Sequence, residues 1–458
     1  MFGRRKDSLF ALLRGGGRMS GREKLRLVLM LSVPAMMGQL STIVMQYIDA
    51  MMVGQLGAEA SASIGLVSTS TWLFGGVCAA LGNGFAVLVA HHIGAKEYDR
   101  ARDVMRQAMF VCMMLALCVC LFCLAIHNRL PVWLGGDPRV TALSSRYFLV
   151  WSLTLPVMQL LFLSNAMLRV SGNMTVPFLL GVLMCFLDIT FNLQFIPRWG
   201  VTGAAIATSC AGVTVMTLSL THLLLRSPEL SLAGRWGRLH LSKDILRRGS
   251  RIALPMAVEH IVFCGAQIAS TLIVATLGTV AIAANTIGIV VESLCYMPGY
   301  GIGDAATALI GQSYGARRAD LIRSFSRLTV WLGIAVMSLM GVVMYIYAPE
   351  LMRLMNPDLG VQALGTVALR IEAFAEPMYA ASIVVYCIFV GLGDTLVPCV
   401  MNLSSIWLIR VTLAALLAGT MGLQGVWLAM CIELNVRGVI FLIRLKRKHI
   451  VYNADNKG

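Results

Sequence analysis

The sequence predicts an all-α membrane protein in which twelve transmembrane helices form two pseudo-symmetric six-helix lobes. Three observations lead to this fold class. The 458 residues are 58% hydrophobic and only 13% charged, about half the charged fraction of a typical soluble domain. Apolar stretches long enough to cross a bilayer recur from Leu25 to Leu445. Finally, the second half of the chain repeats the first.

The predicted helices follow one another with short connections. In chain order they cover residues 26–53, 62–90, 106–127, 146–169, 175–197, 201–225, 250–275, 281–312, 326–348, 366–391, 396–419 and 424–443. The longest connection, between the sixth and seventh helices, holds roughly two dozen residues, too few for a soluble domain.

The segment 1–24 is basic and rich in glycine. It shows no cleavable signal, because the apolar run that follows is a full span rather than a short signal-peptide core. All twelve cysteines lie inside apolar segments. Buried thiols that act as small hydrophobic side chains explain them, and no disulfide framework or metal site is expected.

The distribution of lysine and arginine predicts the orientation. If both termini are cytoplasmic, the tails and the even-numbered connections carry 29 of the 37 basic residues. The opposite side carries six, namely Arg129, Arg139, Arg146, Arg198, Arg353 and Arg370. Basic residues concentrate on the cytoplasmic side of membrane proteins, so we expect both termini in the cytoplasm. The formal net charge of +15 is then a topology signal rather than a sign of nucleic-acid binding.

The two halves of the chain match at a constant offset of 221 in the numbering. The matched pairs are Pro34 with Pro255, Leu56-Gly57 with Leu277-Gly278, Gly82 with Gly303, Gly94-Ala95 with Gly315-Ala316, Arg102 with Arg323, Asp137 with Asp358, Pro156 with Pro377, Gly172 with Gly393 and Val176-Pro177 with Val397-Pro398. After one inserted residue, Gly203 pairs with Gly425. Each repeat has an even number of helices, which predicts two parallel lobes related by an axis along the membrane normal.

Five segments follow from the helices and the repeat. We expect a basic cytoplasmic N-terminal segment at 1–24, an N-lobe at 25–226, a cytoplasmic linker at 227–249, a C-lobe at 250–444 and a cytoplasmic tail at 445–458. Two such lobes are the architecture of an alternating-access transporter, whereas a channel is more naturally a ring of identical subunits.

Ionisable residues within the predicted spans are the main candidates for function. They are Asp49, Asp188, Glu259, Glu292, Asp304, Glu372, Glu376, Glu433, Arg410 and Arg437. A charge at the bilayer centre costs about 2.5–3.5 kcal/mol on insertion scales. With eight acids and only two bases, most of the carboxylates must be protonated, hydrated or bound to a cation.

The first lobe contains the predicted coupling-ion site. Gln39, Gln46 and Asp49 fall on one face of the first helix, where they can line a cavity together. Asp188 and Asn192 are i,i+4 neighbours on the fifth helix. Carboxylate and amide oxygens suit H+ or Na+. The alternative is that these acids cap a helix end or hold neighbouring helices together by hydrogen bonds.

A second candidate site, for a cation or the substrate, lies in the second lobe. Its residues are Glu259, Glu292, Glu372, Glu376 and Tyr379, with Gln267 on the same helix face as Glu259. Acids beside an aromatic ring would suit an organic cation. Pro34, Pro255 and Pro377 are candidate bends, because proline removes a helix hydrogen bond. The alternative is that these acids pair with Arg410, Arg437 or the backbone.

Two further acids have a structural interpretation. Asp304 lies near the cytoplasmic end of its helix, where we expect it to meet an arginine from the neighbouring loop. Glu433 and Arg437 are i,i+4 on the last helix and are expected to form an ion pair.

No enzyme motif is present. A glycine-rich loop that ends in Lys-Ser or Lys-Thr is absent from the sequence, so ATP is not the expected energy source. We expect neither an enzyme nor a cofactor other than the coupling ion, H+ or Na+.

Several motifs resemble the multidrug and toxic compound extrusion (MATE) family. Pro34, Asp49, the run 52–57 (MVGQLG) and Gly94-Ala95 resemble its first two helices. Residues 301–316 (GIGDAATALIGQSYGA) and 203–208 (GAAIAT) are similar to its eighth and sixth helices. The resemblance covers nearly the whole chain. It implies a twelve-helix secondary antiporter that exports organic cations in exchange for H+ or Na+.

The resemblance also implies roles for single residues. Asp49 matches the first-helix acid that takes part in coupling in the DinF-like branch, which this chain resembles most. Glu259 matches the seventh-helix acid of the sodium-using branch. The tenth-helix acid of that branch would fall at Tyr379, so the resemblance implies a second-lobe site that is either partial or moved to Glu376. H+ is the favoured ion, because two acids of the first lobe suffice to carry it.

The sequence therefore predicts an efflux antiporter of the plasma membrane, in a bacterium the inner membrane. Its expected partners are small organic cations and the lipid bilayer, with no nucleic acid, and it is expected to be a monomer. One alternative is a flippase or exporter of a lipid-linked precursor or other metabolite, which would need more basic cavity residues than Arg410 and Arg437. The other is a membrane receptor or scaffold without transport, which leaves the repeat and the internal acids unexplained.

Overall fold

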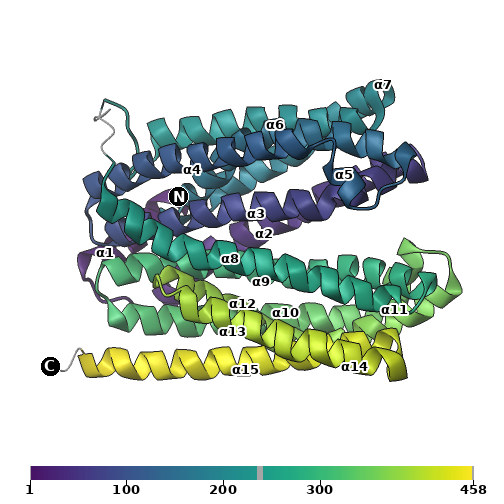
Figure 1. The fold of residues 1–458 in the computed structure, drawn as a ribbon. Coiled ribbons are helices and arrows are strands. Elements are labelled where there is room, and N and C mark those ends of the chain that lie inside the picture. Colours follow the sequence, from purple (N-terminus) through teal and green to yellow (C-terminus); the bar gives the residue numbers. More distant parts are fainter. Residues whose placement is uncertain (1, 235–240, 456–458) are drawn as a thin grey trace. The chain divides into compact units, whose positions relative to one another are not determined.

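A computed structural model describes residues 2–234 and 241–455. The described residues form helices and connecting turns, with no strand among them (Figure 1). The helices are α1 Phe2–Gly15, α2 Gly21–Gly54, α3 Ala58–Gly94, α4 Tyr98–Ile126, α5 Leu130–Trp133, α6 Pro138–Val170, α7 Thr175–Thr221, the π-helix η1 His222–Arg226, α8 Lys243–Ala275, α9 Thr279–Gly315, α10 Ala319–Met355, α11 Leu359–Glu372, α12 Glu376–Gly391, α13 Leu396–Ser405, the π-helix η2 Ile406–Val411, α14 Thr412–Met421 and α15 Leu423–Asp455. Met1, 235–240 in the expected linker and 456–458 of the tail lie outside the described residues.

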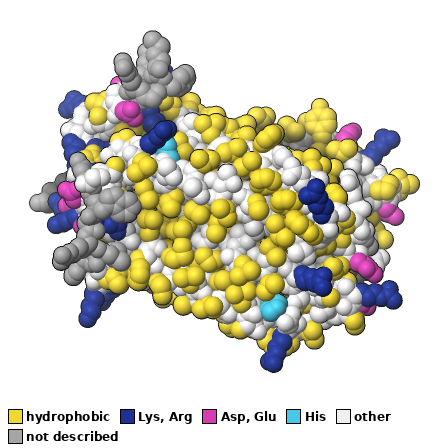
Figure 2. Space-filling model, turned by 90° about the horizontal axis from the view of Figure 1, so that it is seen from above, with side chains coloured by type: hydrophobic (Ala, Val, Ile, Leu, Met, Phe, Trp, Pro, Cys, Tyr) yellow, Lys and Arg dark blue, Asp and Glu magenta, His cyan; other side chains and the backbone are white. Residues whose placement is uncertain are grey.

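The described helices contain the twelve spans that the sequence predicts. Ten helices are long and apolar enough to cross a membrane, and the bent pair α11–α12 adds an eleventh span. The twelfth arises because α7 holds two spans that are separated by non-helical backbone at Gly200. On the face shown in Figure 2, hydrophobic side chains cover the middle of the helices, while Lys and Arg side chains gather toward the helix ends. This distribution is the one expected for a multi-pass membrane protein.

The backbone follows the repeat closely. Helices α3 and α9 begin and end at the offset of the sequence repeat, and so do α6 and the pair α11–α12. Backbone with positive φ, which costs energy outside glycine, recurs at equivalent positions. The pairs are Gly57 with Gly278, Lys96 with Arg317 and Gly172 with Gly393. Asp137 and Asp358, a pair found in the sequence, both cap the helix that follows them.

The chain divides into two compact units. We call residues 40–260 the N-unit and residues 1–39 with 261–458 the C-unit. The borders lie inside the continuous helices α2 and α8, at Leu40 and Ile261, which are equivalent positions of the repeat. The first half of each repeat's first helix therefore belongs to the same unit as the other repeat's remaining helices. In the C-unit, a Cβ on Gly301 of α9 would come within 2.5 Å of the backbone nitrogen of Met36 in α2, which shows how closely these two helices pack.

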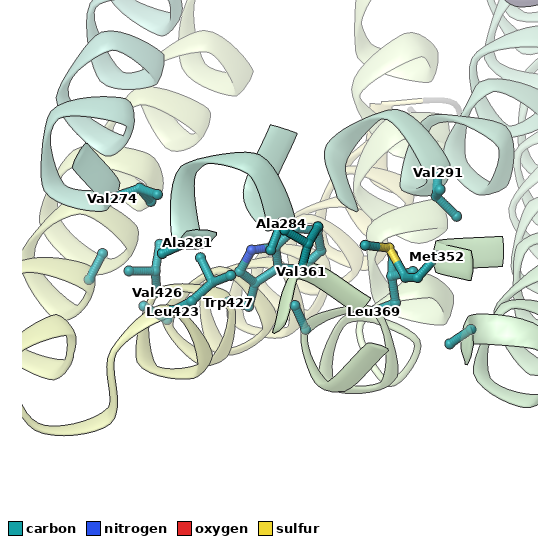
Figure 3. Packing of buried hydrophobic residues seen from close by; sticks show 14 of the residues in the cluster. Val274, Ala281, Ala284, Val291, Met352, Val361, Leu369, Leu423, Val426 and Trp427 are labelled. Carbon is teal, nitrogen blue, oxygen red and sulfur yellow. The ribbon is translucent and has the colours of Figure 1, made fainter. Parts of the chain in front are cut away.

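Each unit has its own hydrophobic core. One cluster of the C-unit packs Val274, Ala284, Met352, Leu369 and Trp427 from five helices (Figure 3). Trp427 is 1% exposed, and its indole nitrogen donates a hydrogen bond to Asn285 Oδ1 at 3.0 Å. A buried tryptophan needs such a partner for its N–H. In the N-unit, smaller clusters such as Leu161, Met184, Ala211 and Val215 hold α6 against α7.

The structure adds details that the sequence analysis did not predict. Residues 2–15 of the basic N-terminal segment form a helix, α1, whose Leu13 is fully buried and whose Arg14 donates to Gln312 Oε1 at 3.0 Å. The expected single helix 366–391 is broken into α11 and α12, which meet at a bend of 59°. Its repeat partner α6 stays one helix through Pro156, so a proline alone does not produce the break.

Candidate functional site

The first candidate site lies in the N-unit, where α2 and α7 bring two carboxylates to one amide. Asn192 Nδ2 donates to Asp49 Oδ1 at 2.7 Å and to Asp188 Oδ2 at 3.0 Å. The side chains of Asp188 and Asn192 share a face of α7 because they are one turn apart. Asp188 is fully buried, Asn192 is 1% exposed and Asp49 is half-buried. We call these three residues the Asp49 triad.

The Asp49 triad has unused oxygen atoms. Asp188 Oδ1 and Asn192 Oδ1 are buried and have no hydrogen-bond partner. Two carboxylates that share one amide donor repel each other if both are ionised, and burial strengthens the repulsion. A proton or a small cation would remove this repulsion and give an unpaired oxygen a partner. Carboxylate and amide oxygens are hard ligands, which suit such an ion. The triad therefore offers oxygen ligands of the kind that a proton or a small cation requires.

The two glutamines expected to accompany Asp49 fall in different units. Gln39 belongs to the C-unit, where its Nε2 donates to Asp304 Oδ2 of α9 at 3.2 Å. Asp304 therefore has an amide partner from α2, and the arginine expected beside it stays a prediction. Gln46 follows on α2 in the N-unit and is exposed. The cavity that these residues were expected to share with Asp49 stays a prediction.

The second candidate site lies in the C-unit, at the break between α11 and α12. Glu372 is the last residue of α11 and Glu376 is the first residue of α12, directly before Pro377. Both glutamates are fully buried, and all four of their carboxylate oxygens lack a hydrogen-bond partner. Gly341 of α10 makes room for Glu376, because a Cβ there would lie 3.1 Å from the Cβ and Cγ of Glu376. Such isolated carboxylates are costly unless they hold a proton or meet a cation.

Glu433 of α15 forms ion pairs with both intramembrane arginines, Arg410 and Arg437. Arg410 of η2 donates two hydrogen bonds to Glu433 Oε2, at 2.8 and 3.1 Å. Arg437 Nε lies 3.2 Å from Glu433 Oε1, which confirms the expected i,i+4 ion pair. Ser405 donates to Glu433 Oε1 at 2.6 Å. The alternative was that these arginines pair directly with Glu372 or Glu376. Among the described residues they pair with Glu433 instead, and the carboxylates of Glu372 and Glu376 have no hydrogen-bond partner.

Aromatic rings complete the C-unit site. Tyr379 packs at a tilt against Tyr296 of α9, with ring centroids 5.6 Å apart, and Tyr296 meets Tyr300 at 6.0 Å. Glu292, which is 5% exposed, lies one helical turn before Tyr296. The guanidinium of Arg437 lies over the Tyr379 ring, 5.6 Å from its centroid. Tyr296 and Tyr300 were not among the predicted site residues, although Glu292, Tyr296 and Tyr300 follow one another at i,i+4 spacing, which was a readable signal.

Other predicted site residues fall outside this cluster. Glu259 lies on the part of α8 that belongs to the N-unit and is half-buried, so it is in a different unit from the other second-lobe acids. Gln267 follows on α8 within the C-unit. Pro34 and Pro255 lie inside α2 and α8, each assigned as one uninterrupted helix, whereas Pro377 stands at the 59° bend.

His260 was not singled out in the sequence. It is the last residue of the N-unit, and its Nε2 lies 3.0 Å from the backbone oxygen of Trp72 in α3. That oxygen can only accept, so Nε2 carries the proton. The ring fits against Gly76, where a Cβ would overlap it. Its repeat counterpart is Gln39, which also hydrogen-bonds to another helix. The polar residue at this position of both repeats was a readable signal.

Comparisons with known proteins agree with this architecture. The family profile MatE matches residues 34–194 and 255–416, one stretch in each repeat. The probable multidrug resistance protein NorM of Thermotoga maritima is 24% identical over 90% of both chains, and NorM of Brucella suis is 27% identical over 93% of both. A crystal structure of MATE in the straight conformation superimposes with a TM-score of 0.90 at 20% identity, over 97% of this chain and 99% of the other. An outward-facing multidrug resistance MATE family transporter gives 0.89 at 20% identity, over 94% and 97%.

Proposed function

Because the chain belongs to the MATE family of membrane transporters, we propose that it is a secondary efflux antiporter that exports organic cations, drugs among them, in exchange for H+ by alternating access. It is a transporter rather than an enzyme. The names of its relatives, probable multidrug resistance proteins, support the choice of drugs as substrates. One observation carries the coupling: the amide of Asn192 bridges Asp49 and Asp188 at 2.7 and 3.0 Å.

The proposed cycle follows from the charge of the Asp49 triad. When the triad holds no ion, its negative charge favours the binding of a cationic substrate to the N-unit. When H+ enters from outside and neutralises one carboxylate, the attraction for the substrate falls and the substrate is released outward. Two ligands that weaken each other's binding have a negative coupling free energy, and this coupling is reciprocal. No energy source other than the ion gradient is needed.

Three further parts of the proposal rest on the sequence. We propose that both termini are cytoplasmic, from the count of 29 basic residues against six. We propose N- and C-lobes with the boundaries 25–226 and 250–444, and a monomer as the working form. We also propose that Glu372 and Glu376 provide a second cation-binding position, which the buried oxygens without partners support.

The decisive experiment reconstitutes the purified protein in liposomes. Ethidium transport is measured first with a pH gradient and no Na+, then with a Na+ gradient at equal pH. We expect the pH gradient alone to drive transport, and we expect Asp49→Asn and Asp188→Asn to stop it. Asp304→Asn is the matched control, because an asparagine oxygen can still accept the hydrogen bond of Gln39, and it should transport at the wild-type rate.

Each other outcome has a definite meaning. Transport driven only by Na+ would overturn the assignment of H+ and leave the antiporter. Transport under neither gradient, with folded protein and several cationic dyes, would overturn the antiporter and favour a flippase. Loss of transport in Asp304→Asn together with the other variants would show that any loss of intramembrane charge is harmful, which would remove the special role of the Asp49 triad.

A further inference from the structure

Arg437 is a buried arginine that forms an ion pair with Glu433 but has no hydrogen-bond partner at its Nε. The residue is 8% exposed, and its Nε has no hydrogen-bond partner although it lies 3.2 Å from Glu433 Oε1. Glu433 does not depend on it, since Arg410 donates twice to one carboxylate oxygen and Ser405 donates to the other. What Arg437 does contact is an aromatic face, because its guanidinium carbon lies 5.6 Å from the centroid of the Tyr379 ring.

The surroundings of Arg437 carry more negative than positive groups. We define the Tyr379 cluster as Glu292, Tyr296, Tyr300, Glu372, Glu376, Tyr379, Arg410, Glu433 and Arg437. Its four acids face two bases, and Glu372 lies within electrostatic reach of the other three acids and of Arg410. Both carboxylates at the α11–α12 break are fully buried without any partner. The cluster can therefore accept additional positive charge.

The aromatic side of the cluster suits a planar cation. Tyr379, Tyr296 and Tyr300 form a continuous series of rings from α12 to α9. A cation on an aromatic face gains up to about 2 kcal/mol or more when it is desolvated. A guanidinium stacks on rings and pairs with carboxylates better than a compact, strongly hydrated ammonium does. The position of Arg437 demonstrates that a guanidinium group fits beside Tyr379 and Glu433.

We propose that the Tyr379 cluster binds a small organic cation that carries a guanidinium or amidinium group, and that Arg437 is the resident cation which this ligand displaces. The ligand's planar group takes the place over Tyr379, and its charge is balanced by the partnerless carboxylates of Glu372 and Glu376. Arg437 thereby determines specificity, since it excludes cations that cannot compete with a guanidinium for the same ring. This inference deepens the proposed function, on which it rests, by naming a class of organic cation and its binding residues.

The test measures equilibrium binding to the full-length protein purified in detergent. Methylguanidinium is titrated by calorimetry, with methylurea as a neutral molecule of nearly the same shape. We expect methylguanidinium to bind and methylurea not to bind. Removing the competitor in Arg437→Gln should tighten methylguanidinium binding about tenfold, a change that one displaced cation–π contact can supply.

Two further comparisons separate the site from general effects. Tyr379→Leu should weaken methylguanidinium binding about tenfold, whereas Tyr379→Phe, which keeps the ring face, should bind as the wild type does. Arg444→Gln is the matched control for Arg437→Gln. Arg444 lies on the same helix, 5.0 Å from the ring centroid of Phe389, but its carboxylate partner is Asp394 outside the cluster. Its replacement should leave the affinity unchanged.

Equal binding of methylguanidinium and methylurea would overturn the proposal, as would unchanged affinity in folded Arg437→Gln. If Arg437→Gln does not fold, the pair Tyr379→Leu and Tyr379→Phe decides, and equal affinity in both contradicts the site. Because binding is measured without a gradient, this inference and the antiporter proposal can fail separately. Dye efflux without methylguanidinium binding removes the inference alone. Binding that depends on Tyr379 without efflux of any substrate removes the antiporter and leaves the site.

Discussion

Arg410 of the C-terminal repeat corresponds to Asp188 of the N-terminal one when the repeats are aligned at an offset of 222. Thr175 and Leu396, which begin the equivalent helices, keep the repeat offset of 221, whereas the positive-φ glycines Gly200 and Gly422 are offset by 222. The inserted residue is accommodated by the π-helical turn Ile406–Val411, as single insertions into α-helices commonly are. Arg410 lies inside this turn, and at the offset of 222 that holds beyond the turn it corresponds to Asp188, so that the acid of one repeat is aligned with a base of the other.

This exchange of charge changes what each unit can bind. Asp188 shares Asn192 with a second acid, so the N-unit triad is short of positive charge. Arg410 instead pairs with Glu433, whose counterpart at the offset of 222 is the apolar Ala211. The two repeats therefore share the order of their helices but differ in electrostatics. The unneutralised acids of the C-unit are those at the α11–α12 break.

Replacing Asn192 by leucine should reduce efflux at least about tenfold, equivalent to about 1.4 kcal/mol. The variant loses the amide that holds Asp49 and Asp188 together, and it leaves buried acceptors unsatisfied. The measurement is the initial rate of ethidium efflux at equal amounts of protein in the membrane. Thr190→Val is the control, since its exposed hydroxyl bonds only to its own helix at Phe186. A wild-type rate in Asn192→Leu would contradict the bridging role.

Glu433→Gln should lower the free energy of unfolding by about 3–5 kcal/mol, because it leaves Arg410 and Arg437 buried without a counter-charge. The quantity can be measured by reversible denaturant unfolding in detergent micelles. Glu350→Gln, a neutralised glutamate at an exposed position of α10, should change it by less than about 0.5 kcal/mol. Equal stability of the two variants would show that the buried arginines have other partners.

Gly76→Ala should destabilise the protein by about 1–3 kcal/mol, the usual cost of an overpacked contact. The new Cβ would overlap the His260 ring, whereas the Cβ of Gly75→Ala meets nothing closer than Trp151 at 4.0 Å. Gly75→Ala is therefore the control for changed helix propensity. His260→Ala should remove most of the penalty when it is combined with Gly76→Ala. Thermal unfolding of the wild type, the two single variants and the double variant gives the coupling free energy between the two sites. Additive effects would rule out the contact.

Acid should weaken the attachment of the α12–α13 connection to α15. Burial by itself would raise the pKa of Asp394, but the hydrogen bond from Lys448 and the charges of Lys448 and Arg444 outweigh it and hold the pKa below its ordinary 3.8. A carboxylate whose pKa is lower in the folded state stabilises the fold above its unfolded-state pKa and loses this contribution as the pH falls through the folded-state value.

The stability difference between the wild type and Asp394→Asn should therefore be constant above about pH 5 and shrink as the pH falls below 3.8. Thermal unfolding of both proteins between about pH 3 and pH 8, a range that includes the ordinary carboxylate pKa, measures it. A difference that grows on acidification would contradict the ion pairs of Asp394 with Arg444 and Lys448, which are both 2.8 Å long.

The sequence by itself determined the class of fold, the twelve spans and the repeat. It also determined which neighbours share a helix face, such as Asp188 with Asn192 and Glu433 with Arg437. These features are local or periodic, because apolar length and i,i+4 spacing act through the geometry of one helix. Asp49 and Asp188 could be chosen as candidates from the cost of charges in the membrane.

Only the tertiary structure decided which helices these residues meet. Asp49 and Asn192 are 143 residues apart when they bond, and Gln39, on the same helix as Asp49, belongs to the other unit with Asp304. Pro156 lies in a continuous helix and Pro377 at a break, although the repeat makes them equivalent. The physical reason is that lipid and neighbouring helices are equally apolar, so hydrophobic patterns do not select partners. Close packing and hydrogen bonds between helices make that choice, and they exist only in the folded protein.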